Sequence, residues 1–419
     1  MHPNALLDLA TELLRQVLKF DQPADAVVSA FFRKHRGLGQ RERHSLAETT
    51  YAVLRQRLLL AHLAQSGSGA LERRLAALAW QGGDTFLRGA LGPQEQKWLA
   101  EVKAIDVAGL PEKLRHNLPD WLAGLLKNEL GDDFWPLVNA LDQPAPLDLR
   151  VNTLKAKRED VQAALAAAGI EATPTPYSPW GLRVQGKPAL QKLEVFTCGD
   201  VEVQDEGSQL LAALLSPKRG EMVVDFCAGA GGKTLALGAL MRNTGRLYAF
   251  DVSGHRLDAL KPRLARSGLS NVYPAQIAHE RDDRIKRLAG KIDRVLVDAP
   301  CSGLGTLRRN PDLKWRQSPK SLEELGAKQR DILASAARLL KPGGRLVYAT
   351  CSLLRSENEA VAADFSAAHP EFEPLPAGAA LAAAQVERAP ELDSNGHLRL
   401  WPHRHQTDGF FAAAWQRRP

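Results

Sequence analysis

The pattern of apolar and polar residues divides the chain into a helical first third and a longer region rich in strands. Over residues 4–140 the apolar side chains recur every three or four positions, as they do on one face of an amphipathic helix. The first such face contains Leu6, Leu7, Leu13, Leu14, Val17 and Leu18. The same spacing predicts one long helix over Ala47–Leu63. Because strand patterns are scarce here, we predict an all-helical domain over residues 1–140.

A small mixed region follows a proline-containing linker, Asp142–Pro146. Short apolar runs predict three strands, and a longer amphipathic run predicts one helix. The strands are expected at Leu147–Leu154, Leu182–Val184 and Val201–Gln204, and the helix at Val161–Ala168. These elements predict a small α/β module over residues 145–205.

From Ser208 onward, buried-type strands alternate with helices, which is typical of a doubly wound parallel sheet. The expected strands are Met222–Phe226, Arg246–Phe250, Val272–Gln276, Arg294–Val297 and Arg345–Ala349. The expected helices are Leu235–Met241, Arg256–Ser267 and Leu322–Leu340. Two late runs, Leu398–Trp401 and Phe410–Trp415, are expected to close the sheet's edge as an antiparallel pair. We therefore predict an α/β domain over residues 206–419.

Composition narrows the class of protein. A chain of 419 residues is too long for one ordinary core, which agrees with several domains. Its four cysteines are widely spread and lack zinc-ligand spacing, as expected for free thiols in a reducing cytoplasm. The N-terminus lacks the pattern of a signal peptide, and no apolar run is long enough to span a bilayer. We expect a cytoplasmic protein.

Positive charge is concentrated in one segment. The net charge is +7, and Arg33–Arg57 holds seven basic against two acidic residues, a surplus of five. The segment is either a solvated helical face or a contact for RNA phosphates. The candidates for such contact are Arg33, Lys34 and Arg36.

Two cysteines occupy positions typical of reactive groups. Cys301 follows the predicted strand that ends near Val297, and Cys351 follows the one that ends at Ala349. The carboxyl ends of parallel strands meet at one edge of the sheet, where α/β proteins bind ligands. A free cysteine is often a small buried hydrophobic residue, but two at this edge favour covalent chemistry.

A glycine-rich loop follows the first predicted strand of the sheet. It contains Asp225, Cys227, Ala228, Gly229, Ala230, Gly231, Gly232 and Lys233. Glycines let the backbone approach a ligand closely, but the spacing matches neither the P-loop nor the dinucleotide fingerprint. Asp251 ends the next strand, where a carboxylate can accept hydrogen bonds from a ribose diol. Together they indicate a site for a nucleoside-bearing cofactor.

At these motifs the chain resembles the RsmB/Sun (Fmu) family of S-adenosylmethionine-dependent RNA cytosine-C5 methyltransferases. The resemblance covers roughly residues 145–415. It rests on Val203–Ser208, Asp225–Lys233, Asp298–Gly303, Arg308–Trp315, Ala349–Ser352 and Thr407–Phe411. It implies a Rossmann-like class I methyltransferase domain preceded by an RRM-like module. The helical start is similar, more loosely, to the NusB-like RNA-binding domain of bacterial rRNA enzymes.

The resemblance also implies a mechanism, with S-adenosylmethionine held by the glycine loop, Asp251 and Asp298. Cytosine C5 becomes nucleophilic when a thiolate adds at C6. The family assigns that thiolate to Cys351 and the release step to Cys301, whereas spacing alone does not order the two roles. It places Asp298 near the N3/N4 edge of the base. A cation beside Cys351 would favour the thiolate, and Lys233 and Lys314 are the candidates by family position.

The chain departs from the family pattern at two positions. Ala230 stands in the loop where the family usually has Pro, a change that should leave cofactor binding intact. Ala278 stands where many relatives have an Asp that contacts the adenine amino group. Adenine recognition then falls to the backbone, to Glu280 or to Asp282, and the sequence does not choose among them.

RNA contacts are expected near the site and on the small module. Arg308, Arg309 and Lys314 form a basic stretch with an aromatic residue after Cys301, and Arg150 and Asn152 lie in the module's first strand. We predict a monomeric enzyme that methylates cytosine C5 in RNA, with 16S rRNA as the expected substrate. The alternatives are a tRNA cytosine-C5 methyltransferase and a catalytically silent RNA-binding ribosome assembly factor. A small-molecule or protein methyltransferase would leave the two cysteines unexplained.

Overall fold

The computed structural model describes residues 1–419 and divides them into two compact units. The helical unit consists of Met1–Pro144 and Thr306–Pro319, and the sheet unit consists of Ala145–Gly305 and Lys320–Pro419. The chain therefore leaves the sheet unit directly after the Cys301 loop and returns to it fifteen residues later, at Lys320. None of the helices is both long and apolar enough to cross a lipid bilayer.

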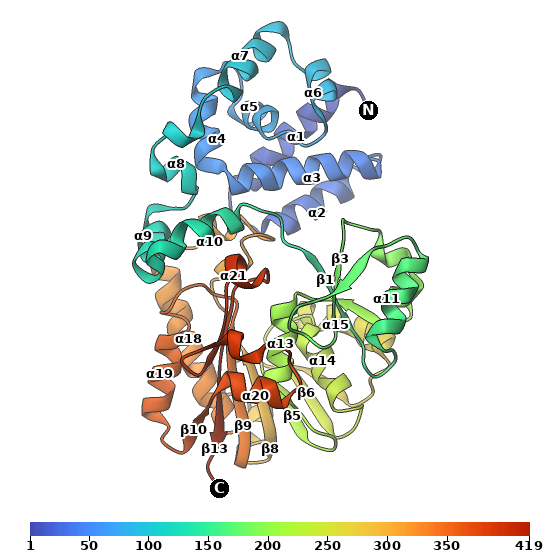
Figure 1. The fold of residues 1–419 in the computed structure, drawn as a ribbon, viewed down its shortest axis with the longest axis vertical. Helices are drawn as coiled ribbons and strands as arrows, with labels where there is room; N and C mark the ends of the chain where they lie inside the picture. Colours follow the sequence, from blue (N-terminus) through green and yellow to red (C-terminus); the bar gives the residue numbers. More distant parts are fainter. The chain divides into compact units, whose positions relative to one another are not determined.

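The first 141 residues are helical, as the apolar spacing predicted (Figure 1). The helices are α1 (Pro3–Val17), α2 (Ala24–Lys34), α3 (Gln40–Arg55), α4 (Arg57–Leu63), α5 (Leu71–Leu78), α6 (Asp84–Ala90), α7 (Pro93–Lys103), α8 (Glu112–His116), α9 (Asp120–Leu130) and α10 (Phe134–Leu141). Apolar faces of α1 to α7 meet in one buried core that includes Leu7, Leu14, Phe31 and Leu54. Helix α17 (Leu313–Arg316) belongs to the same unit.

The prediction of one long helix over Ala47–Leu63 is wrong, because the helix breaks at Gln56 (φ −109°, ψ 30°). In an unbroken helix the carbonyls of Leu54 and Arg55 would accept hydrogen bonds from the amides four residues later. Here the Trp315 Nε1 donates to Leu54 O (2.9 Å) and the Lys314 Nζ to Arg55 O (2.7 Å). The amide of Leu59 donates instead to Asn117 Oδ1 (3.0 Å). Side chains distant in sequence thus replace the helical bonds.

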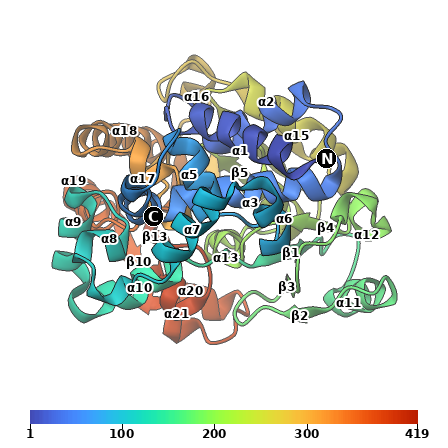
Figure 2. The ribbon, with the colours of Figure 1, turned by 90° about the horizontal axis from the view of Figure 1, so that it is seen from above.

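The sheet unit begins with a small four-stranded antiparallel sheet in the order β2-β3-β1-β4. Its strands are β1 (Leu147–Val151), β2 (Ala172–Pro174), β3 (Gly181–Val184) and β4 (Val201–Val203). Helix α11 (Arg158–Ala167) packs against β2 and β3 (Figure 2). The first strand ends three residues earlier than predicted, and β2 was missed because its three residues include two exposed ones.

The large sheet is doubly wound, with the strand order β11-β12-β13-β9-β8-β5-β6-β7 and with β10 paired to β13. Its strands are β5 (Met222–Asp225), β6 (Arg246–Asp251), β7 (Val272–Gln276), β8 (Ile292–Asp298), β9 (Leu340–Thr350), β10 (Phe372–Leu375), β11 (Asp393–Ser394), β12 (His397–Leu400) and β13 (Phe410–Arg417). Strands β5 to β9 pair in parallel, while β13 pairs antiparallel with β9 and β12. This confirms the predicted parallel sheet with an antiparallel edge.

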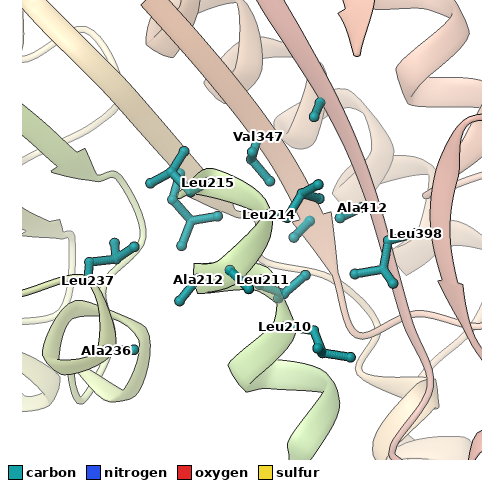
Figure 3. Close-up of a cluster of buried hydrophobic side chains, with 14 of the residues drawn as sticks. Leu210, Leu211, Ala212, Leu214, Leu215, Ala236, Leu237, Val347, Leu398 and Ala412 are labelled. Carbon is teal, nitrogen blue, oxygen red and sulfur yellow. The ribbon is translucent and has the colours of Figure 1, made fainter. Parts of the chain in front are cut away.

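Helices cover both faces of this sheet. On one face lie α13 (Glu206–Leu215), α14 (Gly232–Leu240), α15 (Gly254–Ser267) and α20 (Ala377–Ala383), and on the other lie α18 (Pro319–Ala337) and α19 (Glu359–Ala368). Successive strand residues face opposite ways, so Val223 packs into the first layer and Val224 into the second. Figure 3 shows the leucines of α13 packed against Val347 of β9 and Ala412 of β13. The predicted helix over Leu322–Leu340 ends too late, because Leu340 already starts β9.

The topology fixes where a site can form. The strand order reverses at β5, because β6 and β7 lie on one side of it and β8 and β9 lie on the other. The loops after β5, β6, β8 and β9 therefore leave the same edge of the sheet and diverge there. The glycine-rich segment and the two cysteines of interest follow β5, β8 and β9, and Asp251 is the last residue of β6.

Candidate active site

The two cysteines meet at the carboxyl edge of neighbouring strands. Cys301 lies three residues after the end of β8, and Cys351 directly follows β9. The pairing of these strands continues past their ends, because the Ala299 amide donates to Ala349 O (2.9 Å). The two Sγ atoms lie 3.5 Å apart, within reach of an S–H···S hydrogen bond.

The two thiols are not electrostatically equivalent. The hydrogen bond with Cys351, reinforced by burial, raises the pKa of Cys301 well above its ordinary value. Cys301 therefore keeps its proton near neutral pH and is able to donate the shared hydrogen bond.

Asp298 and Lys233 form an ion pair next to the thiols. The Lys233 Nζ lies 2.7 Å from Asp298 Oδ2. Burial alone would lower the pKa of Lys233, but the Asp298 carboxylate outweighs it and Cys351 adds to the effect, so the pKa is raised. Lys233 thus remains charged, and its Nζ also lies 5.8 Å from the centre of the Phe410 ring. The site holds a fixed cation, a carboxylate and two thiols within one small region.

A cavity of about 720 Å³ opens beside these groups. Its lining includes the glycine loop, Asp251, Asp298, Cys301 and Cys351. Both oxygens of Asp251 are oriented by backbone amides, Oδ2 by Gly229 (2.8 Å) and Oδ1 by Ser253 (2.7 Å). Each oxygen retains capacity to accept a further bond, as a ribose diol requires.

The glycine loop is shaped for close approach of a ligand. Gly229 and Gly231 have positive φ angles of 56° and 80°. A Cβ at Gly231 would lie 2.1 Å from Leu260 Cδ1, so any other residue would displace this buried leucine and strain the backbone. Beneath the loop, burial raises the pKa of Asp225 to about 7. Its Oδ2 accepts from Thr234 Oγ1 (2.7 Å), whereas its Oδ1 is buried without a partner.

The structure distinguishes between Glu280 and Asp282, the two acidic candidates for adenine recognition in a chain that has Ala278 in place of the usual Asp. Ala278 and Glu280 both line the cavity. Asp282 does not, and its carboxylate accepts from the amides of Ala278 (3.0 Å) and Arg284 (2.9 Å). Of the two acidic candidates, Glu280 is the one that faces the cavity. Cys227 also lines it, but burial raises the pKa of that thiol well above its ordinary value.

Arg150 and Asn152, both predicted to contact RNA, lie in the interior of the sheet unit. The Arg150 Nη1 donates to Gly232 O (2.6 Å) in the glycine loop, and burial lowers its pKa to about 10. The Asn152 Nδ2 donates to Gly199 O (3.0 Å) and to Ser267 O (2.9 Å). Arg150 thus joins the small module to the glycine loop, and Asn152 joins it to the end of α15, roles that the sequence did not indicate.

The basic candidates in the helical unit fall into two groups. Arg33, Lys34 and Arg36 are exposed around the end of α2, with Lys34 Nζ 3.5 Å from Glu12 Oε1. Arg308 and Lys314 are buried, and Arg309 is half-buried. Burial lowers the pKa of Lys314 to about 7. Surface contact with RNA is thus open to the first group and not to Lys314.

Glu357 is a site residue that no sequence pattern indicated. Its fully buried carboxylate accepts hydrogen bonds from Ser302 and Ser352, the residues that follow the two cysteines. It is one of 48 acidic residues, and only the folded arrangement sets it apart.

The reversed parallel sheet, the glycine loop and the strand-end carboxylate Asp251 define a Rossmann-like methyltransferase domain. A family model described as 16S rRNA methyltransferase RsmB/F matches residues 212–416. A second, described as an RsmF/B-like ferredoxin-like domain, matches residues 118–191, which begins earlier than the boundary predicted at residue 145. The chain belongs to the RsmB/F family of methyltransferases.

Individual relatives agree with this assignment. The chain is 37% identical to a probable ribosomal RNA small subunit methyltransferase B of Synechocystis sp., over 71% of this chain and 66% of that protein. It is 32% identical to the protein of the same name in Bacillus subtilis, over 80% and 74% of the two chains. Among solved structures, that of PH0851 has a TM-score of 0.81 at 29% identity and covers 100% of this chain and 99% of its own.

Proposed function

We propose that the protein transfers a methyl group from S-adenosylmethionine to C5 of a cytosine in RNA, with 16S rRNA as the substrate. The observation that carries the proposal is the pair of thiols 3.5 Å apart beside the ion pair of Lys233 and Asp298. Two relatives named as small subunit rRNA methyltransferases support the choice of RNA.

The cavity residues fit a nucleoside-bearing cofactor. Asp251 would accept from the ribose hydroxyls, and the backbone of the glycine loop would follow the amino-acid portion. When bound, S-adenosylmethionine supplies a methyl group on a sulfonium, an electrophile that C5 takes as the sulfur–methyl bond breaks. A volume of about 720 Å³ falls within the range of cofactor pockets, about 300–1,000 Å³.

Cys351 is the nucleophile of this proposal. Its thiolate adds to C6, a new S–C6 bond forms, and the electron pair of the C5–C6 double bond moves toward C5 and the N3 edge. In this proposal Cys301 stays protonated and donates the shared hydrogen bond to the Cys351 sulfur before the addition. The charged Lys233 attracts negative charge on that sulfur.

Asp298 and Cys301 serve the two later stages. Asp298, held by Lys233, accepts a hydrogen bond from the cytosine amino group and thereby orients the base. After methylation a water molecule that enters from solvent takes the C5 proton, the electron pair of the C5–H bond restores the C5–C6 double bond, and the S–C6 bond breaks to regenerate the Cys351 thiolate. Cys301 then donates its S–H hydrogen bond to the departing sulfur.

Two single substitutions test the mechanism on transcribed, unmodified 16S rRNA. Cys351→Ala should abolish methyl transfer, because the proposal assigns the addition at C6 to this thiol and only the release step to Cys301. Cys301→Ala should form the bond to C6 but release it slowly, so a protein–RNA adduct should accumulate on a denaturing gel. Full activity of Cys351→Ala would refute the mechanism.

Two further measurements separate this proposal from its alternatives. Calorimetric titration with S-adenosylmethionine should show binding, and its absence would favour a silent assembly factor. Bisulfite sequencing of rRNA and tRNA from cells that lack the protein should show loss of a methylated cytosine in 16S rRNA. Loss from tRNA instead would reassign the substrate.

A further inference from the structure

One buried carboxylate joins the loops of both cysteines. Glu357 is fully buried and lies between β9 and α19. Its Oε1 accepts from the Ser302 amide (2.8 Å) and from Gln329 Nε2 (3.0 Å). Its Oε2 accepts from the hydroxyls of Ser302 (2.5 Å) and Ser352 (2.5 Å). Ser302 follows Cys301, and Ser352 follows Cys351, so each bond lies one peptide from a thiol.

The carboxylate is itself held from several sides. The Tyr348 hydroxyl of β9 donates to the backbone O of Glu357 (2.6 Å). Gln329 of α18, also fully buried, shares its Nε2 between Glu357 and Pro300 O (3.0 Å). The hydroxyls of Ser302 and Ser352 lie 3.2 Å from each other. A buried carboxylate with several donors resists displacement, because every lost bond leaves a buried polar group unsatisfied.

Two buried side chains next to Glu357 contact the Cys351 loop. The Asn358 side chain bonds Thr350 Oγ1 and donates to Ser352 O (3.0 Å). Arg399 donates to Leu353 O (2.6 Å). Both contacts lie on the Cys351 side. Glu357 is thus set apart from these neighbours by bonds to both cysteine loops.

We propose that Glu357 is a positioning residue that fixes the separation of the two thiols of the methyl-transfer site through Ser302 and Ser352. The inference rests on the proposed function, because the proposed methyl transfer is what requires the two thiols to lie at a fixed distance from each other. Addition needs the Cys301 S–H aimed at Cys351, and release needs the same contact again. Displacement of either loop by about 1 Å should cost about 100-fold in rate, although no substrate atom touches Glu357.

The test compares Glu357→Gln with wild type in the full chain. Glutamine keeps the volume but replaces one acceptor oxygen with a donor amide, so it cannot accept all four hydrogen bonds. We expect kcat to fall about 10- to 100-fold while KM for RNA and the affinity for S-adenosylmethionine stay within about twofold. Asn358→Ala is the matched control, because it removes hydrogen bonds to the Cys351 loop alone.

A second readout reports the distance between the thiols without RNA. Diamide takes two electrons and two protons from a pair of close thiols, which then form a disulfide. Mass spectrometry of the linked Cys301 and Cys351 peptides gives the rate. We expect this rate to fall in Glu357→Gln and in the double variant Ser302→Ala/Ser352→Ala. Adding Glu357→Gln to that double variant should change it by less than about twofold, because both hydroxyl bonds to Glu357 Oε2, including the one from the Cys351 loop, are already gone.

The outcomes separate the explanations. Wild-type kcat and wild-type disulfide rate in Glu357→Gln would overturn the inference. So would a fall in kcat that merely matches a fall in the stoichiometry of S-adenosylmethionine binding, since that reports a misfolded fraction. Failure of the proposed function has a different signature, because Cys351→Ala would then remain active whatever Glu357→Gln does.

Discussion

Lys314→Met should make the helical unit more stable near neutral pH, and the gain should shrink as the pH rises. Lys314 is 7% exposed and donates one hydrogen bond, to Arg55 O. Burial lowers its pKa from 10.5 to about 7, so the folded state strongly disfavours the charged ammonium. Methionine has a similar shape and carries no charge to bury.

The magnitude follows from the difference between folded and unfolded pKa values. Between about pH 7 and pH 10.5 the unfolded chain binds a proton at Lys314 that the folded chain does not, so stability rises with pH there. The full pKa difference corresponds to about 5 kcal/mol, and below pH 7 burial of the charged Lys314 destabilises the folded state by this amount. Between about pH 7.5 and pH 9 it changes by about 2 kcal/mol. Loss of the bond to Arg55 O offsets about 1 kcal/mol of the gain at every pH.

Hydrogen exchange of the α3 amides measures the stability of the helical unit close to Lys314. The free energy of opening should rise with pH in wild type relative to Lys314→Met, by about 2 kcal/mol between the two pH values. Lys320→Met, at a lysine whose side chain is 85% exposed, controls for loss of a positive charge. Parallel pH profiles for wild type and Lys314→Met would refute the reasoning, because they would mean that Lys314 is not buried as an amine.

Three other substitutions test separate parts of the molecule. Asp251→Asn should weaken S-adenosylmethionine binding about 10- to 100-fold in calorimetry, because it removes a charged acceptor for the ribose hydroxyls, and unchanged affinity would contradict that role. Gly231→Ala should abolish detectable cofactor binding while melting remains cooperative, since its Cβ would lie 2.1 Å from a leucine methyl at a φ of 80°. Neutralising Arg33, Lys34 and Arg36 together to Gln should weaken RNA binding and reduce the slope of log affinity against log salt by about 2. An unchanged slope would exclude these three residues from the RNA interface.

Strands β5, β6 and β7 were the most predictable part of the fold. Strand β7 was predicted at its observed bounds, although it lies at the end of the sheet and is partly exposed, and β5 and β6 were predicted to within one residue. The position of Cys301 and Cys351 at one edge followed from the rule that the carboxyl ends of parallel strands meet at one edge of the sheet. The sequence could not show that their sulfur atoms lie 3.5 Å apart, since the strand order that makes β8 and β9 neighbours is a property of the whole sheet.

Contacts between distant segments explain what was missed. The break at Gln56 depends on Lys314 and Trp315, which follow it by more than 250 residues. No local pattern at Ala47–Leu63 predicts that two helical carbonyls will accept hydrogen bonds from the side chains of another segment. Glu357 was missed for the same reason, because its donors come from three separate elements.

Two buried cations share one kind of partner. Arg150 and Lys314 were expected to contact RNA, yet each donates inside the protein to a backbone carbonyl, Arg150 at Gly232 in the glycine loop and Lys314 at Arg55, the last residue of α3. Arg399 does so as well, at Leu353 O. Carbonyls at the carboxyl ends of helices lack helical partners, and a long cationic side chain can reach such a carbonyl from another element, as Lys314 does. A basic residue inside a functional motif can therefore either contact RNA or bind a backbone carbonyl inside the protein. The two roles look alike in sequence, and the burial of the side chain distinguishes them. Contacts with RNA phosphates should consequently be sought among exposed cations such as Arg33 and Arg36, even though these lie far from the cysteine motifs in sequence.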